Sequence, residues 1–292
     1  MRPGGEKPGG RGPLKEVEDR MKIIADFHSH TCYGDGRHTP EEMVEAACRM
    51  GLQDYGISEH GFLDHYLGGT FGMDDGAFSR YLDELRELKE RYRGRLHLHI
   101  GVEQDGMGPV QKAEYTIGST HQLQKDGEYV MLDETEELLK DAVDRLWKGD
   151  WYAMTADYYA RESRIHQLTG CEIVGHFDLV TKFNQDGKLF DMGSADYLGP
   201  ALDAMRRLNG EDVYFEINTG AISRGYRREP YPDFRLLREL KLMGGRIMIN
   251  SDSHSTGGLG CGFHQAWKLA AECGFDGYYI LAPEGGFRKI VF

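Results

Sequence analysis

One pattern recurs along the chain and sets its class of fold. A short apolar run ends in a polar residue that can bind a metal ion, and a segment with helical periodicity follows. The runs are KIIADFHSH, DYGISEH, LHIGVEQD, YTIGSTH, EIVGHFD, VYFEINTG and RIMINSDSH. Near-continuous apolar strands are typical of a parallel sheet that is buried on both faces. The alternation of these strands with helices therefore predicts a parallel α/β barrel in a single domain.

Composition narrows the class of protein and the kind of partner. The chain has 292 residues, of which 40% are hydrophobic, as in an ordinary globular protein with a core. The formal net charge of −13 opposes a phosphate backbone, so we expect no nucleic-acid partner. No apolar run is long enough to span a bilayer, and five cysteines without paired spacing indicate a reducing, cytoplasmic location.

The first residues differ in composition from the remainder. Residues 1–21 are rich in glycine, proline and charge, and they lack the apolar stretch of a secretory signal. We therefore expect a disordered leader over residues 1–21 and the barrel domain over residues 22–292.

Capping signals mark the start of two helices. Thr39, Pro40 and Glu42 form a capping box with proline at the first helical position, and Gly51 predicts the end of this helix. Asp133 and Glu136 predict a second capping box, and the segment 151–168 reads as one helix.

Each apolar run delivers polar side chains to its C-terminal end, the functional face of a parallel barrel. Side chains two residues apart on a strand share a side, so His28 pairs with His30 and Asp252 with His254. A lone histidine at a strand end is usually a satisfied polar residue, but the joint set indicates a metal site for zinc, manganese or iron. The strand-end candidates are His28, His30, His60, Glu103, His121, His176, Asp178, Glu216, Asn218, Asp252 and His254.

Other histidines are expected to have structural roles only. His97 and His99 precede Glu103 on the same strand but lie too far back to reach its end. His65, His166 and His264 fall in a loop or on helices.

These motifs carry a family resemblance. The stretch DFHSHTCYGDGRHTPEEMVEAACRMGLQDYGISEH resembles the opening of the PHP (polymerase and histidinol phosphatase) superfamily, and GVEQD, GSTHQL, GHFDLVTKFN, FEINTG and NSDSH follow in the family's order. GSTHQL, GHFDLVTKFN and FEINTGAISRGYRREPYP are most similar to the stand-alone histidinol-phosphate phosphatases. The resemblance implies a distorted (β/α)7 TIM-like barrel.

The resemblance also implies two to three divalent metal ions, of zinc, manganese or iron. The ligands of the first ion would be His28, His30, Glu103 and Asp252. Those of the second would be Glu103, His121 and His176, and those of the third would be Asp35, His60 and His254. Asp35 is favoured because GDG resembles the SDG of many family members, while His38 is the alternative ligand at this point.

The implied reaction is hydrolysis of a phosphate monoester by metal-activated water. Glu103 would bridge two ions about 3.5–4 Å apart and so act as a catalytic residue. Asp178 is the second catalytic candidate, by orienting His176, and Glu59 would act likewise beside His60.

Substrate contacts are expected from residues that follow the strands. Arg224 and Lys182 are candidates for binding phosphate oxygens, with a solvated loop charge as the alternative for each. Glu216 and Asp105 are candidate acceptors for a substrate that carries an ammonium group and an imidazole.

The leading hypothesis is a histidinol-phosphate phosphatase of histidine biosynthesis, with L-histidinol phosphate as its small phosphorylated substrate. A PHP phosphoesterase for a nucleotide, an oligonucleotide end or phosphotyrosine is the alternative. A non-catalytic metal-binding module is a third interpretation, which the complete ligand set disfavours. We expect no membrane partner, and a homo-oligomer is compatible with the sequence.

Overall fold

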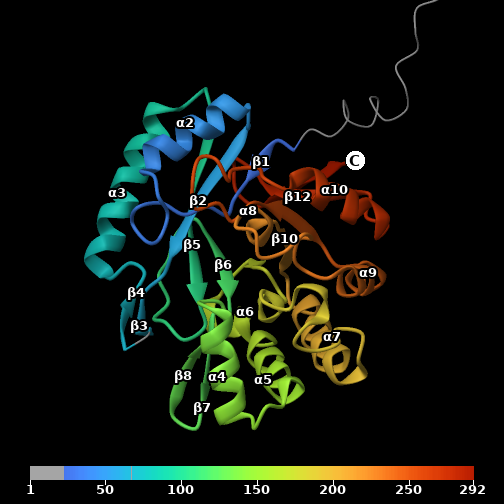
Figure 1. Cartoon of the computed structure of the whole chain (residues 1–292). Helices are drawn as coiled ribbons and strands as arrows, with labels where there is room; N and C mark the ends of the chain where they lie inside the picture. Colours follow the sequence, from blue (N-terminus) through green and yellow to red (C-terminus); the bar gives the residue numbers. More distant parts are fainter. Residues whose placement is uncertain (1–22, 67) are drawn as a thin grey trace, which may run out of the picture.

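The computed structural model describes residues 23–66 and 68–292, and the expected leader over residues 1–21 lies outside them. Its centre is a seven-stranded sheet in the order β1-β2-β5-β6-β9-β10-β11, with parallel neighbours throughout (Figure 1). These strands come from the seven apolar runs, so the predicted parallel α/β barrel is confirmed. Their bounds are β1 Ala25–Asp26, β2 Asp54–His60, β5 His97–Asp105, β6 Tyr115–Ser119, β9 Ile173–Val174, β10 Tyr214–Asn218 and β11 Ile247–Asn250.

The sheet nearly closes where β1 meets β11. An isolated parallel bridge joins Ser29 to Ser253, and the amide of His30 donates to the Ser253 carbonyl at 2.8 Å. The buried Asp26 carboxylate accepts hydrogen bonds from the backbone and the hydroxyl of Ser251. The first and last runs of the sequence therefore converge, as the strand-end histidines require.

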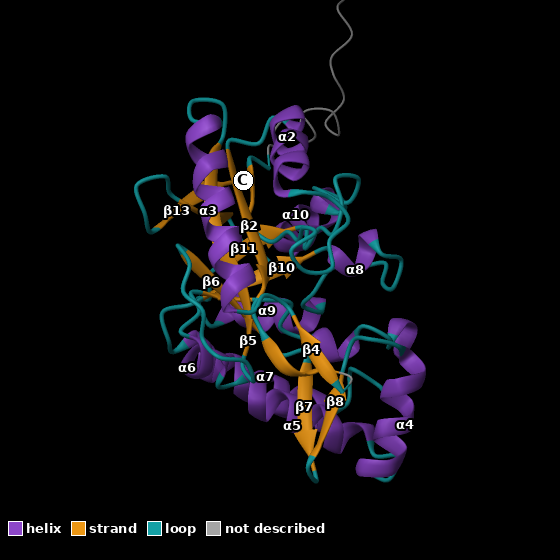
Figure 2. Cartoon of the chain, turned by 90° about the vertical axis from the view of Figure 1, so that its left-hand side faces the viewer, coloured by secondary structure: helices purple, strands orange, loops and turns teal. Residues whose placement is uncertain are grey.

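Helices surround this sheet (Figure 2). The predicted cap of α2 is confirmed, because Thr39 and Glu42 form a capping box and Gly51 ends the helix with a φ of 76°. The other expected boundaries differ: α4 is capped by Thr135 and not by Asp133, and the segment 151–168 divides into α5 and α6. The helices are α2 Pro40–Met50, α3 Asp75–Arg91, α4 Glu136–Leu146, α5 Trp151–Glu162, α6 Ile165–Thr169, α7 Ala195–Asn209, α8 Gly220–Ser223, α9 Phe234–Leu242 and α10 Phe263–Glu272, with 3-10 turns at Leu179–Thr181 and Gln185–Gly187.

Three antiparallel hairpins add to the strand–helix alternation in the described part of the chain. Two of them lie beside one another next to α4 in Figure 2, where His65 and Tyr129 stack at 4.5 Å between ring centroids. The C-terminal segment forms the third hairpin. The pairs are β3 Leu63–Tyr66 with β4 Gly69–Phe71, β7 Gln122–Lys125 with β8 Glu128–Met131, and β12 Gly277–Leu281 with β13 Phe287–Val291.

One buried tyrosine fixes the backbone just before the first histidine pair. Tyr115 donates to the Phe27 carbonyl at 2.6 Å. Its ring fits because Gly56 and Gly101 have no side chain, and a Cβ on either would lie 2.2 Å from a Tyr115 atom. The absence of a side chain at these two glycines therefore allows an aromatic ring to pack closely against the strands. Among the described residues, no helix is long and apolar enough to cross a membrane.

Candidate active site

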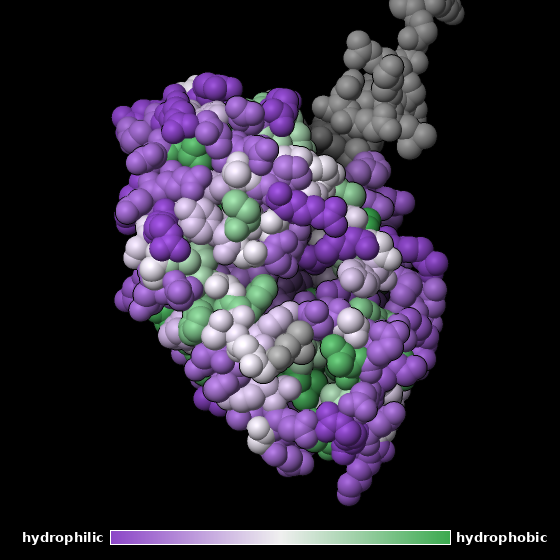
Figure 3. Space-filling model, turned by 60° about the vertical axis from the view of Figure 1, so that its left-hand side comes forward, coloured by the Kyte–Doolittle hydropathy of each residue, from purple (hydrophilic) through white to green (hydrophobic). Residues whose placement is uncertain are grey.

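The candidate ligands gather at the C-terminal ends of the barrel strands, around a cavity of about 740 Å³. Figure 3 shows the hollow on this face of the molecule, with hydrophobic side chains beside it. All nine sequence-predicted ligands fall within overlapping groups of side chains whose ligand atoms lie within 4.8 Å of one another. They are His28, His30, Asp35, His60, Glu103, His121, His176, Asp252 and His254.

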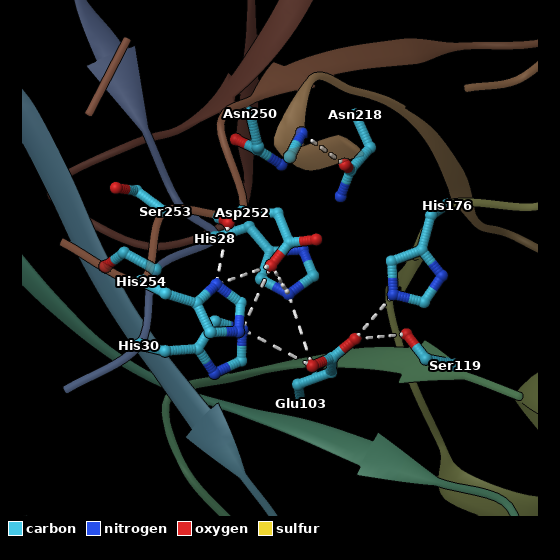
Figure 4. A network of polar contacts seen from close by, with 12 residues as sticks. His28, His30, Glu103, Ser119, His176, Asn218, Asn250, Asp252, Ser253 and His254 are labelled. Carbon is cyan, nitrogen blue, oxygen red and sulfur yellow. Dashed lines mark hydrogen bonds and ion pairs between the residues drawn. The ribbon is translucent and has the colours of Figure 1, made fainter. Parts of the chain in front are cut away.

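Glu103 is the centre of the deeper part of the site. Its carboxylate lies within 3.5 Å of a ring nitrogen of five histidines. The hydroxyl of Ser119 donates to Oε1 at 2.7 Å, and Figure 4 shows Ser119, His28, His30 and His176 around this carboxylate. Both oxygens are engaged, since His121 and His176 face Oε1 while the other three face Oε2. This geometry suits the predicted bridging role. The five histidines are His28, His30, His60, His121 and His176.

A second group lies nearer the mouth of the cavity. Asp35 Oδ1 lies 3.2 Å from His254 Nε2 and 3.7 Å from His60 Nε2. His38 instead lies against Thr256, whose amide donates to its Nδ1 at 3.3 Å. The structure thus places Asp35, and not His38, with the third set of ligands.

Buried carboxylates stand behind three of the imidazoles. Nδ1 of His28 lies 2.8 Å from Glu216, and Nδ1 of His30 lies 3.1 Å from Glu59. Nδ1 of His121 lies 3.5 Å from Asp105, and in each case Nε2 is the nitrogen that faces Glu103. Carboxylates in this position fix the ring orientation of metal ligands. The full set is His28 with Glu216, His30 with Glu59, and His121 with Asp105.

This arrangement changes the roles expected for three acidic residues. Glu59 holds the ring of His30 and accepts a hydrogen bond from the backbone amide of His60. Glu216 and Asp105 are buried behind the histidines, where they do not face the cavity as substrate acceptors would. The sequence carried no signal for these pairings, because each joins residues from different strands.

The donor set fits divalent metal ions. Nε2 of His28, Nε2 of His30 and Oε2 of Glu103 are buried and make no hydrogen bond to another described residue. Buried polar atoms are normally paired, so three such atoms facing one point indicate a bound group. Imidazole nitrogen with carboxylate oxygen is a ligand set suited to zinc, manganese or iron.

The charges of the site are strongly coupled. Burial alone would raise the pKa of Glu103, but His28 and His121 hold it well below its usual range. Burial alone would lower the pKa of His30, yet the neighbouring carboxylates of Asp252 and Glu59 raise it to about 10. Protons would therefore compete with a metal ion for these nitrogens.

The expected substrate-binding cations both line the cavity. Arg224 lies 3.0 Å from Asp252 Oδ2 and 3.0 Å from His254 Nδ1, directly beside the outer ligands. Lys182 donates to the Asp133 carbonyl and lies 4.6 Å from the centroid of the Tyr226 ring. Both cations thus line the candidate site, and their binding to phosphate stays a prediction.

Asp178 is buried beside the site. Its Oδ2 accepts the amide of Asp233 at 2.9 Å, and Oδ1 makes no hydrogen bond to a described residue. Nδ1 of His176 is likewise buried without such a bond. A role for Asp178 in orienting His176 stays a prediction.

Some residues that line the cavity were not among the candidate site residues predicted from the sequence. Tyr66 and Phe71 stack at 4.5 Å between ring centroids, and Tyr66 donates to Glu134 at 2.5 Å. Asp133 lines the same wall. The glycine pair in LDHYLGGTF, between aromatic residues, was the available hairpin signal.

Fold and site together define an α/β-barrel protein with a candidate histidine–carboxylate metal site at its strand ends. The chain belongs to the PHP domain family, whose model matches residues 26–220, and the predicted family is confirmed.

Individual relatives match most of the chain. The Bacillus subtilis histidinol-phosphatase is 26% identical over an alignment of 259 positions that covers 80% of this chain and 95% of that protein. A Listeria monocytogenes structure with a provisional histidinol-phosphatase name has a TM-score of 0.72 at 21% identity, covering 82% of this chain and 98% of that one. The Lactococcus lactis histidinol phosphate phosphatase, solved with zinc, L-histidinol and phosphate, has a TM-score of 0.66 at 19% identity. The match covers 90% of this chain and 98% of that chain. The two structures establish that the fold is shared.

Proposed function

We propose that this protein is a metal-dependent phosphate monoester hydrolase, and specifically a histidinol-phosphate phosphatase of histidine biosynthesis. The observation that carries the proposal is the convergence of all nine predicted ligands in overlapping groups beside one cavity. Relatives that match most of the chain and carry the histidinol-phosphatase name support the substrate.

The ligand groups of the site would hold two to three divalent ions, of zinc, manganese or iron. Such ions would neutralise negative charge on the phosphate oxygens and would lower the pKa of a bound water toward neutral pH. Glu103 faces both halves of the deeper cluster, so it is the residue suited to bridge two ions. The carboxylates behind His28, His30 and His121 keep these rings in place.

The chain's own cations would bind the phosphate. Arg224 reaches the cavity at the outer ligands, and a guanidinium can donate two parallel hydrogen bonds to phosphate oxygens. Lys182 lies on the same cavity and would add a second positive charge. Their location beside the ligand cluster directs the ester phosphorus toward the metal-binding end.

The groups suited to an organic cation lie beside Lys182, whose Nζ is 3.5 Å from Asp133 Oδ2. Asp133 and Glu134 bring carboxylates to the cavity, and Tyr66 and Phe71 bring a stacked aromatic surface. An ammonium group would bind the carboxylates, and an imidazole would pack on the rings. These residues replace Glu216 and Asp105 as the acceptors that we propose for L-histidinol phosphate.

A specificity assay tests the proposal. The metal-loaded protein would be offered histidinol phosphate, p-nitrophenyl phosphate, nucleotides, phosphotyrosine and a short oligonucleotide. We expect kcat/KM for histidinol phosphate to exceed the others by about 100-fold or more, because the cavity carboxylates lose a partner when the ester carries no cation. Equal values for histidinol phosphate and p-nitrophenyl phosphate would refute the substrate. Glu103→Gln is the control and should abolish hydrolysis of every ester.

A further inference from the structure

Glu216 is a carboxylate with every acceptor position filled. Oε1 lies 2.8 Å from His28 Nδ1 and 2.9 Å from Asn250 Nδ2. Oε2 accepts the amide of His176 at 3.0 Å and Asn218 Nδ2 at 2.8 Å. The side chain has no solvent exposure, so these four groups are its surroundings. An ionised carboxylate accepts about four hydrogen bonds, and Glu216 therefore acts only as an acceptor.

Backbone amides determine which way the two asparagines face. The Phe27 amide donates to Asn250 Oδ1 at 2.9 Å, and the Gly220 amide donates to Asn218 Oδ1 at 2.9 Å. A backbone N–H can only donate, so each asparagine must turn its oxygen toward the backbone. Its NH₂ group must then face Glu216. Asn218 and Asn250 lie close to the ligand cluster in Figure 4.

The donor and acceptor roles continue to His28. Glu216 Oε1 accepts one hydrogen bond from the NH₂ group of Asn250. Its second neighbour is His28 Nδ1, which must donate to this acceptor and therefore carries a proton. Nε2 is then the only ring atom of His28 open to the ligand cluster, 3.3 Å from Glu103 and 3.8 Å from Asp252. The orientation of a metal ligand is thereby set from the backbone, through an amide and a carboxylate.

The network also spans the part of the barrel with the shortest strands. Glu216 and Asn218 lie on β10 and Asn250 on β11, while His28 follows β1 and His176 follows β9. β1 and β9 have two residues each, so few ladder hydrogen bonds fix these chain segments. Side-chain hydrogen bonds hold them together at the level of the metal ligands.

We infer that Asn218, Glu216 and Asn250 form a positioning triad for His28, and that the affinity of the site for metal depends on this triad. None of the three need touch a metal ion or the substrate. The inference rests on the metal site of the proposed function and is independent of which ester is hydrolysed.

Substitutions that keep shape and change the donors test the triad. Glu216→Gln would turn an NH₂ group toward two existing donors, and Asn218→Asp would place a second carboxylate against Glu216. We expect both to weaken zinc binding to the metal-stripped protein by about 10- to 100-fold, measured by competition with a chelator. Asn184→Asp is the control, because Asn184 is a buried amide hydrogen-bonded to Phe190 and Leu189. Zinc affinity should not change in this control.

Nitrogen NMR of the histidine side chains tests the same inference in the zinc-loaded wild-type protein. A variant is needed only to assign the signal of His28. We expect a proton on Nδ1 of His28, assigned by its loss in His28→Gln. Absence of that proton would overturn the inference, as would unchanged zinc affinity in Glu216→Gln and Asn218→Asp. Equal weakening in Asn184→Asp would also overturn it, because the loss would then reflect general instability. A wild-type protein that binds no zinc would contradict the proposed function and the triad together.

Discussion

Asp35 and His38 lie three residues apart, but only Asp35 faces the ligand cluster. Asp35 contacts His254 and His60, while His38 turns to the backbone of Thr256. Asp35→Asn should therefore lower the number of tightly bound ions by one, because an amide is a much weaker ligand than a carboxylate. Elemental analysis after gel filtration would measure this. His38→Gln is the matched control, and a lost ion in this variant instead would reverse the assignment.

Alternation along a strand is sufficient to place His28 and His30 on one side from the amino-acid sequence alone. The strand-end rule likewise brings Glu103 and Asp252 to the same face. The orienting pairs are different: Glu59 was expected beside His60, yet it lies on the ring of His30. Such pairs depend on the rotation of neighbouring strands about the barrel, which residue spacing within one strand does not contain.

At the scale of elements, the seven apolar runs predicted the strands because both faces of a parallel sheet are buried. The two hairpins that follow β2 and β6 were missed. They are short, partly exposed and lack a strict apolar alternation, with a burial pattern of one buried, two exposed and one intermediate residue in β3. These two hairpins are stabilised by contacts with one another and with the cavity wall, and not by local β-propensity.

The β3–β4 hairpin is held at the cavity by Tyr66. Its hydroxyl donates to Glu134, and its ring stacks on Phe71. Tyr66→Phe keeps the ring but loses the hydrogen bond, which should destabilise the hairpin locally by about 1 kcal/mol. Amide hydrogen exchange within the hairpin should then become roughly fivefold faster.

Tyr33→Phe is the control for this element. Tyr33 donates to Glu84 at 2.7 Å, so the same type of hydrogen bond is lost elsewhere. Hairpin exchange should stay at the wild-type rate in this variant. Equal rates in wild type and Tyr66→Phe would show that the hydroxyl does not hold the hairpin.

At the scale of the whole molecule, the barrel depends on contacts between the two ends of the sequence. Asp26 and Ser251 are joined by hydrogen bonds, and Ser29 pairs with Ser253. The expected convergence of the first and last runs is therefore met by polar contacts as well as by strand order. Closure of this kind brings His28 and His30 into one site with Asp252 and His254, although over two hundred residues separate the two pairs.

One buried acid should make the stability of the whole fold depend on pH. Glu162 on α5 is fully buried, and burial raises its pKa to about 8, opposed in part by the Thr120 hydroxyl. An unfolded glutamate titrates near 4.3, so between about pH 4 and 8 the folded state binds more protons than the unfolded state. The free energy of unfolding must then fall as pH rises through this window, by up to about 1.4 kcal/mol per pH unit from this group.

Glu162→Gln removes the titrating group and should remove this slope. Chemical denaturation of the metal-stripped protein at pH 5, 6, 7 and 8 would measure the difference between variant and wild type. We expect that difference to shift progressively in favour of the variant as pH rises, because only the wild type must ionise a buried acid or retain a proton. Glu87→Gln, at an exposed glutamate on α3, should run parallel to wild type. If Glu162→Gln also ran parallel, Glu162 would have to be ionised in the folded protein throughout this range, and its burial would have to be compensated by Arg161 and His121.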